Sequence, residues 1–249
     1  MDKAEPFSAV GEYFGELNRL MEASKDSKKI ARLIADRLGS KYSMSIMNSL
    51  AEIDSLHKEI CEILDDFAGR KTGFLIYLTI DHLILLIKFY VVQWSALIDM
   101  IASLINKTFN LGIAEKDISF GLVRRNRHVQ QSDIIAILKN HGRDLLYDLF
   151  TKHRNEIVHR GKILDKDIID LKLEWNHLYS RKYSFFVDKT ITDDEYKSSS
   201  ASLREKTFKL ASVKQTYYRN HYQKTLKVVA QMIGAMARKT INLYEKDAI

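Results

Sequence analysis

Residues 43–68 read SMSIMNSLAEIDSLHKEICEILDDFA, and apolar side chains recur there every three or four positions. The apolar positions are Ile46, Leu50, Ile53, Ile60, Leu64 and Phe67. This spacing predicts an amphipathic helix over 43–68. Gly69 and Gly73 bracket a break, after which residues 74–108 are apolar on most faces. The second stretch predicts a longer helix at the centre of a bundle.

Composition extends this prediction to the whole chain of 249 residues. One proline and ten glycines are too few for the turns of a β-sandwich, a β-barrel or a doubly wound α/β protein. Abundant Leu, Ile, Lys, Glu and Ala favour helices. We therefore expect one all-α domain over 1–249, with N-terminal helices in 1–40.

The apolar stretch around residues 74–105 raises the question of a membrane span, which we do not expect. Asp81, His82, Lys88 and Asp99 interrupt it, whereas a spanning helix needs about 20 apolar residues with few charges. Asp81 and His82 point about 100° apart on a helix, so they cannot share a metal ion. We see no Gly-rich phosphate loop, and we expect neither a metal nor another cofactor.

A single cysteine, Cys61, excludes an intramolecular disulfide framework and a Cys-based zinc cluster. The first 20 residues carry four acidic side chains and no apolar core of a signal peptide. These features lead us to expect a cytoplasmic protein.

Residues 180–202 differ from the rest of the chain. β-prone side chains cluster at Tyr183–Val187 and at Thr190–Thr192, which predicts a small hairpin or an ordered loop near 183–195. Ser198–Ser200 is interpreted as a flexible joint that ends this insertion. A last, basic helix is expected over 203–246.

The net charge of +7 comes from that last helix. Between Lys206 and Tyr244 there are eight Lys and Arg residues and no Asp or Glu, which leaves 31 basic and 32 acidic residues elsewhere. A basic helix of this kind is typical of a polyanion-binding face. The alternative is a solvated face near an acidic protein partner. A second basic cluster, Arg124–His128, is expected to be solvated, and contact with phosphate is the alternative.

Aromatic and basic side chains alternate over Tyr217–Lys224. Stacking rings among cations suit single-stranded RNA, so Lys214, Arg219 and Lys224 are candidate nucleic-acid contacts, together with Arg160. The alternative is that Tyr218 and Tyr222, four residues apart, pack in the core.

The segment Arg154-Asn155-Glu156-Ile157-Val158-His159 carries the candidate catalytic residues. Asn155 and His159 are four apart and share a helix face. Histidine transfers protons in both directions near neutral pH, and arginine stabilises charge that develops on phosphorus oxygens. The pair suits RNA cleavage by the ribose 2′-OH, which leaves a 2′,3′-cyclic phosphate. Otherwise, Arg154 pairs with a nearby carboxylate and His159 caps the helix.

The Arg-Asn-x-x-x-His pattern resembles the HEPN superfamily, all-α domains with Arg, a polar residue and His at this spacing. The resemblance covers roughly residues 43–176 and includes the long helix pair ahead of the motif. It implies a helical bundle that forms a homodimer, with two motifs facing each other across a cleft. Arg154, Asn155 and His159 would be catalytic, and RNA the substrate.

Many HEPN proteins are metal-independent endoribonucleases that act as toxins or antiphage effectors, which implies a neutralising or sensor protein partner. Others keep the fold as noncatalytic RNA- or nucleotide-binding or regulatory modules. Both alternatives remain open at the level of the sequence.

Overall fold

A computed structural model describes residues 40–69, 73–141, 165–183 and 191–247. About 91% of these residues are helical and none forms a strand, so the all-α prediction is confirmed for the described part of the chain. The long helix pair is also confirmed: α3 spans Ser40–Gly69 and α4 spans Gly73–Thr108. The predicted N-terminal helices of 1–40 lie almost wholly outside the described residues.

Short elements follow α4 and lead into two further helices. The short elements are η1 (Glu115–Asp117), α5 (Phe120–Arg125), α6 (Arg127–Gln130) and α7 (Asp133–His141). The two further helices are α10 (Lys166–Tyr183) and α11 (Asp193–Asp247). Helices α5 and α6 lie in the segment that holds the basic cluster Arg124–His128.

The predicted start of the last helix was wrong, because α11 begins at Asp193 and includes Ser198–Ser200. Thr192 and Glu195 form a capping box. The Glu195 backbone N–H donates to Thr192 Oγ1 over 3.2 Å, and the Thr192 N–H donates to Glu195 Oε2 over 2.6 Å. Thr192 therefore starts a helix instead of ending a strand. No hairpin is present in residues 183 and 191–195, and residues 184–190 lie outside the described part.

The described residues divide into two compact units. Unit 1 contains 40–54, 93–141 and 221–247, and unit 2 contains 55–69, 73–92, 165–183 and 191–220. Helices α3, α4 and α11 each contribute residues to both. The prediction of one domain over 1–249 with a HEPN-like core at 43–176 stays a prediction.

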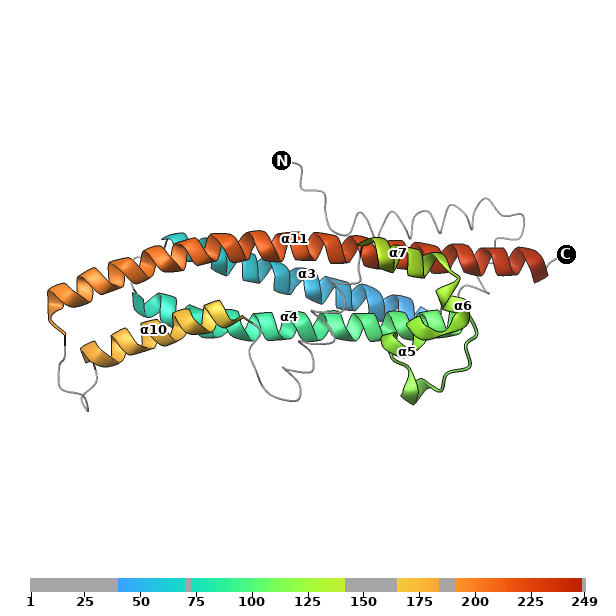
Figure 1. Cartoon of the computed structure of the whole chain (residues 1–249), viewed down its shortest axis with the longest axis horizontal. Helices are drawn as coiled ribbons and strands as arrows, with labels where there is room; N and C mark the ends of the chain where they lie inside the picture. The colour runs from blue at the N-terminus through green and yellow to red at the C-terminus, as the bar shows by residue number, and fades with distance from the viewer. Residues whose placement is uncertain (1–39, 70–72, 142–164, 184–190, 248–249) are drawn as a thin grey trace. The chain divides into compact units, whose positions relative to one another are not determined.

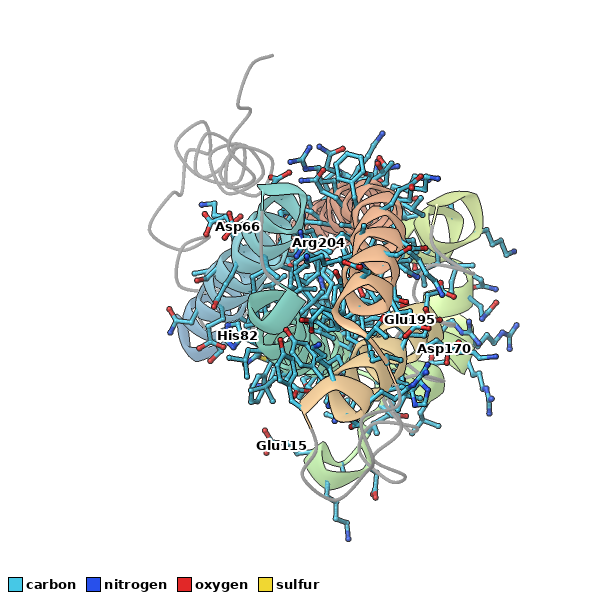
Figure 2. The ribbon with its side chains drawn as sticks, turned by 90° about the vertical axis from the view of Figure 1, so that its left-hand side faces the viewer. Asp66, His82, Glu115, Asp170, Glu195 and Arg204 are labelled. Atoms are coloured by element: carbon cyan, nitrogen blue, oxygen red, sulfur yellow. The ribbon has the colours of Figure 1, made fainter. Side chains whose placement is uncertain are left out.

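In unit 2, α10 lies alongside α4 and runs antiparallel to the beginning of α11 (Figure 1). Trp175 of α10 is fully buried and its Nε1 donates to Thr207 Oγ1 of α11 over 3.2 Å. On the outside, His82 Nε2 of α4 lies 2.8 Å from Glu59 Oε1 of α3. Figure 2 shows His82, Asp66 and Asp170 on the solvent side of their helices.

In unit 1, the second half of α4 supplies the core, with Trp94, Leu97 and Ile101 fully buried. The chain then turns sharply: Asn110 and Gly112 adopt positive φ angles of 49° and 70°. Asn106 holds this turn, since its side chain exchanges hydrogen bonds with both backbone groups of Ile113. Helices α5, α6 and α7 follow near the end of α4 (Figure 1).

Helix α4 is the one described helix long and apolar enough to cross a membrane, over Leu78–Thr108. In its most apolar window, 56% of the residues are buried inside the protein. This burial is compatible with the core helix of a soluble protein, and one such helix is weak support for a span.

Candidate nucleic-acid interface

The candidate catalytic residues Arg154, Asn155 and His159, and the neighbouring Arg160, lie outside the described residues. The described chain resumes at Asp165, six residues after His159. Asp165 stands at the start of α10, where its Oδ1 accepts a hydrogen bond from the Ile168 backbone N–H over 3.4 Å.

Lys214, a predicted nucleic-acid contact, lies between the carboxylates of Asp165, just before α10, and Asp167, in its first turn. Its Nζ is 2.8 Å from Asp165 Oδ1 and 2.8 Å from Asp167 Oδ2. The Lys214 side chain is 15% exposed and that of Asp165 only 8%. Lys214 therefore links the start of α10 to α11 through two ion pairs. It would have to break both pairs to contact RNA.

Protonation of these groups follows from the same contacts. Burial disfavours the ammonium, but hydrogen bonds and Coulomb attraction from Asp165 and Asp167 outweigh this and raise the pKa of Lys214 above its ordinary 10.5. The hydrogen bond from Lys214, followed by its charge, lowers the pKa of Asp167 below 3.8. Lys214 is therefore fully charged and paired at neutral pH.

Lys206, Lys209 and Arg219, three other cations of α11, have carboxylate partners as well. Lys206 bonds to Glu174 of α10, and Lys209 Nζ lies 2.7 Å from Glu205 Oε1 one turn earlier. The predicted contact Arg219 reaches Asp65 of α3, with Nη2 3.6 Å from Oδ2. The Arg219 side chain remains 54% exposed, so it keeps a solvent-facing surface. Carboxylates of the protein thus compensate the charges of Lys206, Lys209, Lys214 and Arg219.

The aromatic positions of Tyr217–Lys224 separate into a core set and a surface set. Tyr218 and Tyr222 are only 4% and 6% exposed, as the core alternative predicts, whereas Tyr217 is 46% exposed. Tyr218 packs edge-on against Tyr90 of α4 in unit 2, with ring centroids 6.1 Å apart. These buried rings cannot stack on bases.

Tyr222 belongs to a buried polar group in unit 1. Its hydroxyl donates to Asp54 Oδ1 of α3 over 3.0 Å, and its ring packs edge-on against Trp94 of α4. Next to it, Thr225 Oγ1 donates to the His221 backbone carbonyl over 2.8 Å. His221 and Thr225 are buried. Tyr222, within the Tyr217–Lys224 segment that was a candidate for RNA binding, thus holds α11 against α3 and α4.

Lys224, the remaining predicted contact, is exposed, and no carboxylate of the described residues pairs with it. The same is true of three cations of this helix that the sequence did not single out. Lys227, Arg238 and Lys239 are exposed, and no carboxylate of the described residues pairs with them. Their local sequence carries a weak signal, since residues 220–240 contain no Asp or Glu.

No group of three or more His, Cys, Asp or Glu side chains among the described residues could hold a metal ion. Among the described residues, Cys61 Sγ lies 3.5 Å from His57 Nε2. Burial raises the pKa of this thiol above 9.0, more than its hydrogen bond with Arg219 lowers it. The thiol is therefore kept protonated and unreactive.

The candidate interface of the described residues thus consists of exposed cations on a helical scaffold. In comparisons with known proteins, no family model, no curated protein and no solved structure matches this chain.

Proposed function

We propose that this protein is a metal-independent endoribonuclease of the HEPN type. The observation that carries the proposal is the Arg154-Asn155-x-x-x-His159 pattern, which combines a proton-transfer group and a permanent cation at helical spacing. The confirmed helix pair α3 and α4 supports it, because the resemblance requires such a pair ahead of the motif.

In the proposed reaction, the ribose 2′-OH attacks the adjacent phosphorus and the 5′-oxygen of the next nucleotide leaves. His159 accepts and donates the protons, Arg154 binds the scissile phosphate, and Asn155 orients the cleft. The products are a 2′,3′-cyclic phosphate and a 5′-OH end. Atoms and charge balance without a metal ion or a cofactor.

One Arg–His pair on a single convex helix does not enclose a substrate. We therefore propose a homodimer in which two motifs form one cleft across a two-fold axis. Light scattering at tens of micromolar should give twice the chain mass of 28.9 kDa. A monomer at that concentration would contradict the shared site.

We further propose that the protein acts in the cytoplasm as a toxin or antiphage effector held in check by a protein partner. The lone, buried Cys61 suits a reducing compartment.

The function is tested by incubating pure protein with mixed-sequence RNA in EDTA and analysing the ends formed. We expect cyclic phosphate ends from the parent protein. His159→Ala should lower cleavage by about 10²–10⁴-fold with little change in affinity. Arg154→Ala should impair both binding and cleavage, and Arg154→Lys should not restore them, because a point charge lacks the bidentate fork.

RNA binding without cleavage by the parent would instead indicate the noncatalytic RNA-binding module. If His159→Ala loses its fold, as judged by circular dichroism, His159 is a structural cap and the motif is a coincidence of spacing.

A further inference from the structure

Ion pairs are distributed unevenly between the two units. Nine ion pairs that join a Lys, Arg or His side chain to a carboxylate among the described residues lie within unit 2. In unit 1, Lys107 has a partner, but no other described Lys or Arg side chain makes an ion pair. Among the described residues, most cations without an ion pair therefore lie in unit 1.

One group of these cations is the arginine junction, defined as Arg124, Arg125 and Arg127. Helix α5 ends at Arg125 and α6 begins at Arg127. Arg125 and Arg127 are exposed and Arg124 is half-buried, and residues 118–132 contain no Asp or Glu. The sequence predicts a solvated cluster here, with contact to phosphate as the alternative.

The backbone of the arginine junction is held in place by several contacts. Asn126 Oδ1 accepts from the His128 backbone N–H over 3.0 Å, and Gln130 Nε2 donates to the Arg124 carbonyl over 2.6 Å. Val123 and Val129 anchor the junction in the core, with 0% and 1% exposure. A fixed backbone reduces the ordering cost when the guanidinium groups bind a ligand.

The second group is the distal α11 set: Lys224, Lys227, Arg238 and Lys239. At about 100° per residue they fall within roughly a 120° arc, and they extend over about 22 Å of helix axis. Along the helix, Lys224 and Lys227 precede residues 228–236, and Arg238 and Lys239 follow them. Residues 228–236 are buried except for the half-buried Gln231. Lys239 Nζ lies 5.7 Å from the centre of the Phe109 ring and has no carboxylate partner among the described residues.

We propose that unit 1 carries the RNA-binding surface of this protein, formed by the arginine junction and the distal α11 set. The inference rests on the proposed function for the identity of the ligand. Phosphates bind cations by displacing condensed counterions. A cation that already pairs with a carboxylate must break that pair first, so Lys206, Lys209, Lys214 and Arg219 contribute little.

The cations of both groups are suited to bind the phosphate backbone, which carries no sequence information directly. Arginine is suited to this contact through its planar, bidentate fork.

Binding is measured by fluorescence anisotropy with a short single-stranded 2′-O-methyl RNA, from about 50 to about 200 mM salt. This probe has no free 2′-OH, so the proposed reaction cannot cleave it. The variants are Arg124→Gln/Arg125→Gln/Arg127→Gln and Lys224→Gln/Lys227→Gln/Arg238→Gln/Lys239→Gln. The matched control is Lys206→Gln/Lys209→Gln/Arg219→Gln, which also removes exposed charges.

Each lost phosphate contact should reduce the log–log salt slope by about 0.7. We expect slope reductions of about 2 for the arginine-junction variant and about 3 for the distal α11 variant, and less than about 0.7 for the control. Circular dichroism checks that all three remain folded. Equal reductions in control and test variants would overturn the inference.

Vesicles containing phosphatidylserine distinguish RNA from an anionic membrane. If the unit 1 variants lose vesicle binding but bind RNA like the parent, the surface serves a membrane and the inference is wrong. If the parent binds the 2′-O-methyl strand through unit 1 but leaves ordinary RNA intact, the inference stands and the ribonuclease proposal fails.

Discussion

Replacing Lys214 with methionine should destabilise the protein by about 3 kcal/mol. The substitution keeps the aliphatic stem but leaves the carboxylate of Asp165, which is 8% exposed, without its cation. Breaking a buried ion pair by removing one partner costs about 3–5 kcal/mol. We take the lower end because Asp165 keeps its hydrogen bond from the Ile168 N–H. The Asp167 carboxylate is 65% exposed and is rehydrated when Lys214 is removed.

Urea denaturation followed by circular dichroism measures this loss. With a slope of about 2–3 kcal/mol per molar urea, the midpoint should fall by about 1–1.5 M. Lys206→Gln is the control, since Lys206 and Glu174 are 52% and 42% exposed and such pairs contribute about 0–1 kcal/mol.

The pH dependence has a definite sign. The raised pKa of Lys214 contributes stability that is present below pH 10.5 and is lost as the pH rises through the folded value. The lowered pKa of Asp167 contributes stability that is present above pH 3.8 and is lost as the pH falls through its folded value. The difference between parent and Lys214→Met should therefore be largest near neutral pH and shrink at both extremes.

Two results would refute this reasoning. One is a midpoint shift no larger than that of Lys206→Gln. The other is a Lys214→Gln variant with parental stability and a salt slope for RNA binding reduced by about 0.7, which would mean that Lys214 contacts phosphate, as its sequence suggested.

Three further substitutions or reactions test other contacts. Thr207→Val should cost about 1–3 kcal/mol in urea denaturation, because the buried Trp175 Nε1 loses its acceptor; an unchanged midpoint would mean that water or another group replaces it. Thr192→Ala should cost about 1 kcal/mol by removing the cap of α11, and a parental melting temperature would show that the helix starts without it. Cys61, at 8% exposure and with its pKa raised by burial, should react with a disulfide reagent only after denaturation, and rapid labelling of the native protein would contradict its position in the core.

Helix positions were largely accessible from the sequence because they depend on local periodicity. Apolar residues from Ile46 to Phe67 recur at helical spacing and are buried on one face of α3. The predicted bounds of the α3–α4 pair agree with the structure within a few residues. The wrong start of the last helix has a local cause: the β-branched residues Thr190–Thr192 favour a strand, whereas the Thr192-x-x-Glu195 capping box in the same segment favours a helix.

The catalytic prediction came from the sequence alone, through the spacing of Arg154, Asn155 and His159. Their placement in the fold lies outside the described residues, so their role stays a prediction. The aromatic residues of Tyr217–Lys224 do not share one environment: Tyr217 is exposed, whereas its neighbour Tyr218 is in the core. Helical spacing alone did not specify which face would meet α4.

The sequence determined that this protein is helical and that its excess positive charge lies in the last helix. Only the tertiary structure decided which of those cations are available to a ligand. Lys214 and Lys224 look alike locally, since neither has an acidic residue within four positions. Lys214 nevertheless meets Asp167, 47 residues away in the chain, whereas no described carboxylate pairs with Lys224. Pairing over such separations depends on how α10 packs against α11, which no local pattern encodes.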